Sequence, residues 1–349
     1  EALALYVGLI ATVFSLSLDQ AQSFVAARRG REGSNQFQFD HLKMSLRQRR
    51  IGAEYAPTSL SPSPCNEGVA KKLKVRPSSL VKIHSSGNKD GDVMVFIHGW
   101  PDSHKLWEYY VDHFGAAFRC VTLTLPGYDE YCQSSVSMDF DDVALALRDT
   151  LVGSLQEQNL MERQIVLCAH DWGCIFGYLI DAKYPGLFSK IIAMDVGPTM
   201  KPSFGMIWRI VAYQAGLIIA FFIGKYISES LGNMLARAEA KILRAPVALN
   251  PQTAKTVTSR MGYPYYYMWK QVLNFRAAKG FLELYHTPSC PILFMYAKQS
   301  PIEFFSREWF NQAGVKFPAS KVVQIDSDHW FLLHKKQDVT SAMCDFLQQ

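Results

Sequence analysis

Short apolar runs recur along the chain from about residue 80 to the C-terminus, and segments with helical periodicity separate them. The runs are rich in Val, Ile, Leu and Phe, and they cover residues 80–83, 93–97, 120–125, 165–168, 191–194, 292–296 and 322–325. Continuous apolar strands that alternate with helices are typical of a mostly parallel sheet that is covered on both faces. We therefore predict an α/β fold with helices on both faces of the sheet.

The alternation of strands and helices stops between residues 197 and 288, where several helical patterns follow one another without a strand pattern. An inserted helical cap is the simplest explanation. Residues 207–224 are apolar enough to resemble a transmembrane helix, but Arg209 and Gln214 interrupt them, which favours a cap helix over an apolar pocket. We predict an α/β core at 80–196 and 289–349, with the cap at 197–288 between its two parts.

The N-terminal region divides into a hydrophobic segment at 1–30 and a polar linker at 31–79. Residues 2–18 carry no charge, and Arg28, Arg29 and Arg31 follow them. Seventeen residues are close to the lower limit for a membrane-spanning helix. If the segment spans a membrane such as the endoplasmic reticulum, these arginines place the catalytic part in the cytosol. The alternatives are an apolar helix docked on a cytoplasmic enzyme, and a signal peptide that lacks the usual basic start.

Composition excludes several classes of protein. A hydrophobic content of 49% and an aromatic content of 13% are sufficient for a packed core and argue against disorder. The net charge of +5 is small, and the basic residues are spread along the chain apart from Arg28, Arg29, Arg31 and the stretch 47–50, so we expect no nucleic-acid partner. The 7 cysteines form no CxxC pair. We interpret Cys120, Cys168 and Cys290 as buried reduced thiols, not as a disulfide framework or a metal site.

The segment 169–173, Ala-His-Asp-Trp-Gly, lies between an apolar strand pattern and an apolar helix pattern. A nucleophile elbow requires small residues two positions before and two positions after its central residue. Ala169 and Gly173 meet that requirement around Asp171. The nearby helix N-terminus favours the ionised carboxylate. We predict that Asp171 is the nucleophile; the alternative is a plain helix N-cap.

Two further segments are placed where a hydrolase of this kind needs them. His98-Gly99-Trp100-Pro101 follows the strand at 93–97, where the loop contributes a backbone N–H to the oxyanion hole. His329 comes just after the last strand, so the nucleophile precedes the histidine as this fold requires. We predict that His329 is the general base.

Four motifs together resemble those of the epoxide hydrolases, with the haloalkane dehalogenases as close relatives. They are His-Gly-Trp-Pro at 98–101, Leu-Pro-Gly-Tyr at 125–128, His-Asp-Trp-Gly at 170–173 and Asp-His at 328–329, and the resemblance covers about residues 80–345. It implies that Asp171 attacks an epoxide carbon to give an ester, and that water activated by His329 hydrolyses this ester to a vicinal diol. It also implies that the N–H groups of Trp100 and Trp172 hold the oxyanion, without a metal or organic cofactor.

The same resemblance implies two cap tyrosines that protonate the leaving oxygen. Tyr213 matches the first, because it stands in a Tyr-Gln pair with Gln214. The second is expected in the aromatic run 263–267; Tyr265 is favoured, while Tyr263 and Tyr266 stay open. Gln214 and Tyr266 are also expected to contact the substrate. Plain aromatic packing of the cap is the alternative for this run.

The acid that orients the histidine departs from the usual pattern. It commonly follows the strand at 292–296, but Ser300 stands at the expected position. Some haloalkane dehalogenases place the acid after the strand that follows the elbow, and here that position is Asp195, 24 residues past Asp171. We predict Asp195 as this acid, with Glu303 in reserve. A buried salt bridge is the alternative role for Asp195.

Three functions follow from these residues. The first is hydrolysis of a small hydrophobic epoxide, since the cap is apolar and a membrane anchor is expected. The second is haloalkane dehalogenation, in which the indole N–H groups of Trp172 and Trp100 bind the halide. The third is a hydrolase-fold binding module without activity, which the missing acid at Ser300 would explain. The tyrosines favour the epoxide, because a halide leaving group requires no proton.

Overall fold

The predicted strands pair in one sheet of seven strands in the computed structural model, which describes residues 80–128, 139–200, 204–273, 288–300 and 302–348. The strands are β1 (Lys82–Gly87), β2 (Val93–Ile97), β3 (Arg119–Thr124), β4 (Ile165–His170), β5 (Lys190–Met194), β6 (Ile292–Ala297) and β7 (Lys321–Ile325). Their order is β1-β3-β2-β4-β5-β6-β7, and only β1 is antiparallel to its neighbour. The prediction of a mostly parallel sheet is confirmed. The proposed N-terminal anchor and linker lie outside the described residues.

The first strand differs from the prediction of residues 80–83. Leu80 and Val81 are buried but precede β1, which runs from Lys82 to Gly87. Because β1 is an edge strand with half-buried and exposed residues, its sequence lacks the continuous apolar run that marks the central strands.

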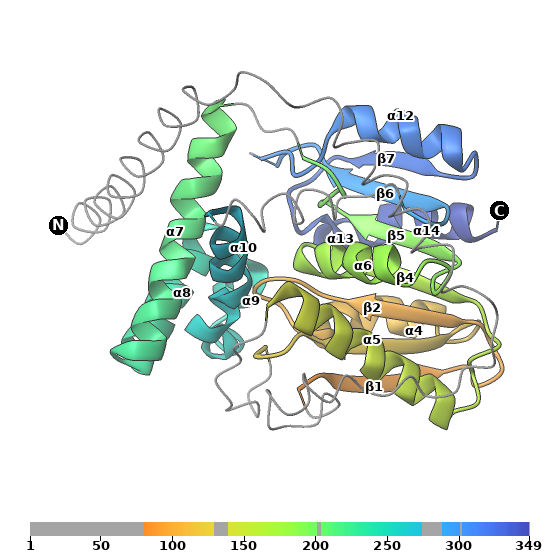
Figure 1. Cartoon of the computed structure of the whole chain (residues 1–349), viewed down its shortest axis with the longest axis horizontal. Coiled ribbons are helices and arrows are strands. Elements are labelled where there is room, and N and C mark those ends of the chain that lie inside the picture. Colours follow the sequence, from red (N-terminus) through yellow and green to blue (C-terminus); the bar gives the residue numbers. More distant parts are fainter. Residues whose placement is uncertain (1–79, 129–138, 201–203, 274–287, 301, 349) are drawn as a thin grey trace, which may run out of the picture. The chain divides into compact units, whose positions relative to one another are not determined.

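Helices cover both faces of the sheet (Figure 1). One face packs against α5 (Phe140–Glu157), α6 (Trp172–Lys183) and α12 (Arg307–Lys316). The other face packs against the short helix η2 (His104–Trp107), α4 (Glu108–Phe114), α13 (Phe331–His334) and α14 (Lys336–Leu347). Side chains of β2 alternate between the two cores: Val93, Val95 and Ile97 enter one, and Met94 and Phe96 enter the other. This alternation explains why the strands are apolar throughout.

Only helices are described between β5 and β6, in residues 204–273. They are α7 (Phe204–Tyr226), α8 (Glu229–Ile242), α9 (Pro246–Leu249), η3 (Ala254–Thr256), η4 (Ser259–Gly262) and α10 (Tyr263–Leu273), and we call them the helical insertion. Tyr128, which follows β3, donates from its hydroxyl to the Met261 carbonyl at 2.8 Å, so the insertion contacts the end of the sheet. Whether it is a separate cap domain stays a prediction.

The long apolar helix expected at 207–224 is α7. Among the described helices it is the one long and apolar enough to cross a membrane, from Trp208 to Tyr226, and 44% of that window is buried in the protein. Gly224 and Gly232 let α7 and α8 cross closely, since a Cβ on Gly232 would collide with the Gly224 backbone. The packed side of α7 thus belongs to the core of the insertion.

The described cysteines are free thiols. Cys120, Cys168 and Cys290 are buried, as predicted. Burial raises the pKa of the Cys120 thiol to about 11 and that of Cys290 to about 12. These thiols are therefore packing groups in their protonated form.

Candidate active site

Asp171 occupies a sharp turn between β4 and α6. Its φ of 52° and ψ of −123° lie outside the regions that L-residues prefer, as a nucleophile elbow requires. Gly173 is needed here, because a Cβ at this position would collide with the Ile97 carbonyl of β2. Asp171 stands at the N-cap position of α6, but its side chain makes no capping hydrogen bond. The carboxylate is thus free to face the site.

Backbone N–H groups surround the Asp171 carboxylate. The Trp100 N–H donates to Oδ2 at 2.7 Å, and the Trp172 N–H is near enough to lower the pKa of the carboxyl. Gly99 permits this approach, since a Cβ there would lie 2.7 Å from the Trp172 nitrogen. Burial raises the pKa of Asp171, while His329 and the two N–H groups oppose the rise. The Oδ1 atom remains free of these donors.

His329 lies between two carboxylates. Its Nδ1 is 2.5 Å from Asp195 Oδ2, and its Nε2 is 4.0 Å from Asp171 Oδ1. Asp195 has a φ of 67° just after β5, and its second oxygen accepts the Ala297 N–H at 2.9 Å. Asp195 is therefore fixed by two bonds, with one oxygen held for the imidazole.

Glu303, the reserve for the orienting acid, does not contact His329. Its carboxylate is half-exposed and pairs at 3.3 Å with Arg307, the first residue of α12. Ser300 donates to the Ile302 carbonyl at 2.8 Å and supplies no charge. The structure thus brings Asp195 to the histidine and leaves Glu303 on the surface.

The protonation of His329 depends on its neighbours. Burial lowers its pKa, but the hydrogen bond and charge of Asp195, with the charges of Asp171 and Asp102, outweigh burial and raise it to about 9. At neutral pH the resting site therefore holds His329 as an imidazolium. Neutralising Asp171 removes one of the charges that hold this proton.

Two further histidines are buried next to the site in neutral form. His98 Nδ1 bonds the Gly99 carbonyl at 2.9 Å, and His98 Nε2 accepts the Leu125 N–H at 3.1 Å. Burial lowers the pKa of His98 to about 4. His170 Nε2 bonds the His329 carbonyl at 3.0 Å, and burial holds its pKa well below the usual range. Both rings fix loops of the site and carry no charge at neutral pH.

Aromatic rings lie beside the nucleophile. The Tyr265 ring stands edge-on to Trp172 at 5.0 Å and to Trp100 at 6.1 Å. Tyr213 contacts Tyr265 at 6.1 Å between ring centroids. Burial and then the nearby Asp171 charge raise the pKa of Tyr265, and both effects also act on Tyr213. Both phenols are protonated and within electrostatic reach of the carboxylate.

Gln214 sets the direction of the Tyr213 hydroxyl. The Trp269 indole N–H, which can only donate, bonds Gln214 Oε1 at 2.7 Å. The other end of the amide is therefore the donor, and Gln214 Nε2 donates to the Tyr213 oxygen at 3.0 Å. The Tyr213 proton is left for another acceptor. Gln214 thus contacts Tyr213 and Trp269.

Tyr266 is placed differently from the prediction. Its ring packs on Phe221 at 5.7 Å, on Phe222 at 5.0 Å and on Tyr267 at 5.0 Å, inside the helical insertion. Residues 265 and 266 of α10 point about 100° apart, so only one of them can face Asp171. Tyr263 contacts Tyr128 at 6.2 Å. Of this tyrosine run, Tyr265 is the residue whose ring reaches both site tryptophans.

Asp102 is a second buried carboxylate at the site that the sequence did not reveal. The Trp330 indole N–H donates to Asp102 Oδ2 at 3.2 Å. Burial raises the pKa of Asp102 to about 7, although Trp330 and His329 oppose the rise. The one available signal was its place directly after His-Gly-Trp-Pro.

Comparisons with known proteins identify the family of this chain. Residues 94–342 match the model of the alpha/beta hydrolase family. The chain belongs to this family. It is 25% identical over 119 residues to Epoxide hydrolase 2 of Caenorhabditis elegans, covering 33% of this chain and 32% of that protein. It is 28% identical over 131 residues to Epoxide hydrolase 3 of Mus musculus, covering 35% of this chain and 33% of that protein.

Among solved structures, Epoxide Hydrolase A from Mycobacterium thermoresistibile is similar, with a TM-score of 0.57 and 15% identity over 78% of this chain and 97% of that chain. At this identity the likeness shows the fold alone. The chain spans about a third of the length of the curated relatives named above. The chain is thus an epoxide hydrolase-like member of the α/β hydrolases, and its own reaction is a proposal.

Proposed function

We propose that this chain hydrolyses epoxides to vicinal diols through a covalent ester on Asp171. The observation that carries the proposal is the carboxylate held by the Trp100 N–H at 2.7 Å, with His329 Nε2 at 4.0 Å and two protonated tyrosines nearby. A carboxylate suits attack on saturated carbon, because it requires no prior deprotonation.

In the first step Asp171 Oδ1 attacks an epoxide carbon, and the bond from this carbon to the ring oxygen breaks. The leaving oxygen takes a proton from Tyr213 or Tyr265. The Gln214 amide supports this role, since it donates to the Tyr213 oxygen and leaves the phenolic proton for the substrate. The product of this step is a hydroxyalkyl ester.

In the second step water hydrolyses the ester. Esterification removes the Asp171 charge, which is one of the charges that raise the pKa of His329. The imidazolium then releases its proton, which returns to the tyrosinate left by the first step, and the neutral imidazole can accept a proton from water. His329 takes a proton from water, and the hydroxide attacks the Asp171 carboxyl carbon. Negative charge develops on Oδ2, where the N–H groups of Trp100 and Trp172 stabilise it. On collapse the ester C–O bond breaks, and the leaving oxygen takes the proton of the imidazolium, which Asp195 stabilises until then. The diol is released, and the proton of the regenerated Asp171 carboxyl returns to His329.

The substrate class follows from the surroundings of the nucleophile. The rings of Trp100, Trp172, Tyr213 and Tyr265 favour a small hydrophobic epoxide. Anchoring of residues 1–30 in a membrane, with the catalytic part on the cytosolic side, would give access to such compounds. The mechanism uses only groups of this chain and requires no cofactor.

Haloalkane dehalogenation is the second candidate, and a specific observation favours it. Among the described residues the buried indole N–H groups of Trp100 and Trp172 have no acceptor at hydrogen-bonding geometry, although the Trp172 indole is near enough to the Tyr265 hydroxyl to lower the pKa of that phenol. Two such donors could bind a halide. The third hypothesis, an inactive binding module, rested on the lack of an acid at Ser300. It loses this support, because Asp195 lies 2.5 Å from His329 Nδ1 and can supply the carboxylate instead.

Steady-state assays separate these functions. The full chain is incubated with styrene oxide and with long-chain fatty-acid epoxides, and diol is measured by mass spectrometry. In parallel, halide release is measured from 1-chlorobutane and 1-bromobutane. Diol without halide supports the proposal, and Asp171→Asn should abolish it. Halide release without diol would replace the proposal with the second candidate.

A further inference from the structure

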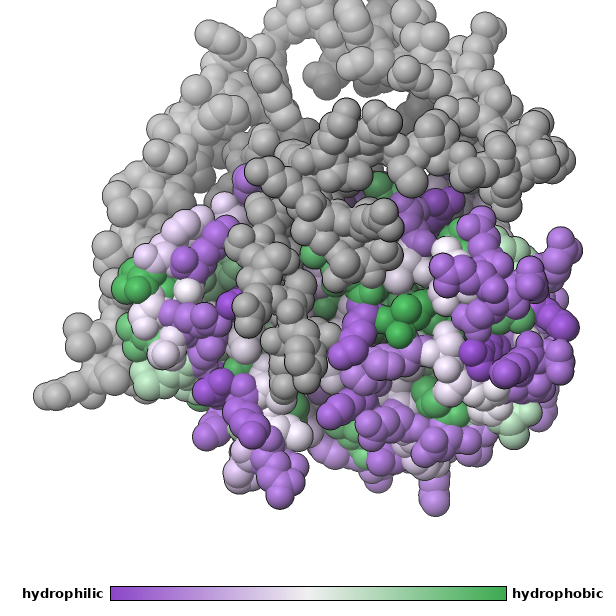
Figure 2. All heavy atoms as spheres, turned by 90° about the horizontal axis from the view of Figure 1, so that it is seen from below, coloured by the Kyte–Doolittle hydropathy of each residue, from purple (hydrophilic) through white to green (hydrophobic). Residues whose placement is uncertain are grey.

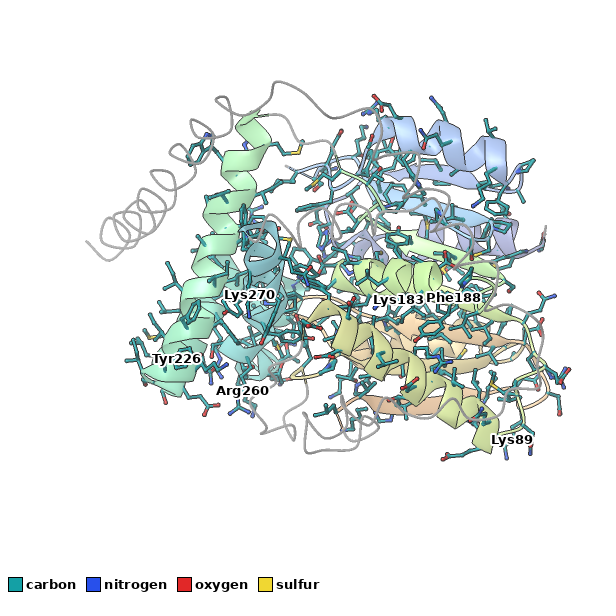
Figure 3. All side chains as sticks on the ribbon, viewed as in Figure 1. Lys89, Lys183, Phe188, Tyr226, Arg260 and Lys270 are labelled. Atoms are coloured by element: carbon teal, nitrogen blue, oxygen red, sulfur yellow. The ribbon has the colours of Figure 1, made fainter. Side chains whose placement is uncertain are left out.

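The helical insertion exposes large apolar side chains at the end where α7 turns into α8. Tyr226 is 67% exposed and Ile227 is 76% exposed, and Phe222, Leu231 and Met234 are exposed beside them in the sequence. The Tyr226 ring stacks on Phe222 at 5.8 Å, so the two form one surface. We call these five residues the apolar tip. Tyr226 lies at the end of α7 and points away from the sheet (Figure 3).

The apolar surface continues along both helices. On α7 the outer row of exposed side chains is Trp208, Ala212, Phe222 and Tyr226, at spacings that place them on one side of the helix. Buried Ala215 and half-buried Ile219 lie on the same side and interrupt this row, which contains no charged residue. On α8 the outer row is Leu231, Met234, Ala238 and Ile242. The opposite sides of both helices are buried through residues such as Leu217, Ala220 and Ala240. Figure 2 shows hydrophobic and hydrophilic residues side by side at the left of the molecule, where α7 and α8 lie in Figure 1.

Positive charge is concentrated in the same part of the chain. Residues 204–273 hold eight basic and two acidic side chains, a net charge of +6, whereas the rest of the chain holds 28 basic and 29 acidic ones. The basic residues are Arg209, Lys225, Arg237, Lys241, Arg244, Lys255, Arg260 and Lys270. Lys225 lies over the Tyr226 ring at 5.3 Å, and Lys241 directly precedes the exposed Ile242. Arg260 and Lys270 belong to the same insertion in Figure 3.

We propose that the apolar tip and the outer rows of α7 and α8 dock on an anionic lipid surface. Exposed aromatic and aliphatic side chains with basic residues close to them are the features of helices that lie in a membrane interface. Each Lys or Arg close to an anionic surface adds to the attraction. The half-buried state of α7 favours docking from one side over spanning of the bilayer.

Charge favours lipid over the other occupants of this surface. A second copy of the chain would bring two insertions of net charge +6 together. The apolar segment 2–18 of this chain is followed by Arg28, Arg29 and Arg31, which the same positive surface repels. An anionic bilayer supplies both the apolar phase and the opposite charge.

The test uses a fluorescent label whose emission reports a nonpolar environment. Tyr226→Cys carries the label in the full chain, with Cys65, Cys132 and Cys344 replaced by serine. The matched control is Val315→Cys on α12, an apolar position that is 85% exposed far along the chain from the insertion. Vesicles contain phosphatidylcholine alone, or with about one quarter phosphatidylserine. Because the readout is local, anchoring by residues 1–30 does not imitate it.

With anionic vesicles we expect the label at 226 to brighten and shift to shorter wavelength, and the label at 315 to stay unchanged. Neutral vesicles should give a much smaller response, and Lys241→Glu with Arg244→Glu should reduce the response to anionic vesicles several-fold. No response at 226, or equal responses at 226 and 315, would overturn the proposal. If the label at 226 already reports a nonpolar environment before lipid is added, the proposal is also overturned. A signal that depends on protein concentration would then identify a second copy as the occupant, and a signal that does not would identify the chain's own N-terminal segment.

Discussion

The two carboxylate oxygens of Asp195 bond different partners, and this arrangement positions His329. One accepts the Ala297 N–H at 2.9 Å, and the other lies 2.5 Å from His329 Nδ1. The first bond fixes the carboxylate, and the second fixes the tautomer and the direction of the imidazole. In the proposed mechanism His329 is required only for hydrolysis of the ester, so loss of the Asp195 charge should affect that step selectively.

Asp195→Asn is therefore expected to slow ester hydrolysis by about 10³- to 10⁴-fold, while alkylation of Asp171 persists. Rapid-quench kinetics with a styrene-type epoxide, followed by mass spectrometry of the intact chain, would show accumulation of the ester. Glu303→Gln is the control and should behave as the unmodified chain, because Glu303 pairs with Arg307 on the surface. Normal turnover of Asp195→Asn would assign the orienting role to another group.

The two site tyrosines should act in the first step. Replacing both Tyr213 and Tyr265 by Phe is expected to slow alkylation by about 10²- to 10⁴-fold, because the leaving oxygen loses its proton donors. Tyr267→Phe, in the same aromatic run, is the matched control. Single-turnover kinetics measure the step directly. Equal rates for the double variant and the control would exclude proton donation by these phenols.

The pH dependence of ester hydrolysis follows from the neighbours of His329. Its pKa of about 9 includes the charge of Asp171, which the ester lacks. Hydrolysis of the trapped ester should therefore rise with pH and level off with a midpoint below pH 9, because the neutral imidazole is the active form. A midpoint at or above pH 9, or a rate that falls as pH rises, would contradict the assignment of His329 as base.

At the scale of elements, the elbow depends on close contact between β2 and α6. A Cβ on Gly173 would collide with the Ile97 carbonyl, which belongs to rigid backbone. Gly173→Ala is expected to lower the free energy of unfolding by about 1–3 kcal/mol and to disturb the nucleophile. Gly153→Ala on α5, where nothing lies within 4 Å, should instead stabilise by about 0.5–1 kcal/mol. Urea denaturation of both variants compares them, and equal effects would refute this account.

The sequence was sufficient to predict the central strands and the site residues that follow them. Parallel strands have their carboxyl ends at the same edge of the sheet, so residues that follow such strands lie close together. Asp171, Asp195 and His329 meet there, after β4, β5 and β7. It was insufficient for β1, whose edge position removes the apolar signal. It also could not choose within residues 263–267, since the rotation of α10 is fixed by packing against α7. The contact of Asp102 with Trp330 joins residues 228 positions apart and leaves no local pattern.

At the scale of the molecule, buried neutral histidines tie stability to pH. The pKa of His98 is lowered from 6.5 to about 4 by burial, so between these values the unfolded chain binds more protons than the folded one. The contribution of His98 to the free energy of unfolding is fully present above pH 6.5 and is lost as the pH falls toward 4. The loss amounts to at most about 3 kcal/mol. Urea unfolding across this range should show a steeper decline for the unmodified chain than for His98→Gln. Parallel declines would contradict the buried neutral state.

The covalent role of Asp171 is tested most directly by turnover in ¹⁸O-labelled water, followed by mass spectrometry of the peptide that contains Asp171. Because water attacks the carboxyl carbon of the ester, repeated turnover of an epoxide should place ¹⁸O in the Asp171 side chain, and the first diol formed should carry unlabelled oxygen from the enzyme. Diol that carries ¹⁸O from the first turnover, with no label in Asp171, would show direct attack of water on the epoxide and would contradict the account.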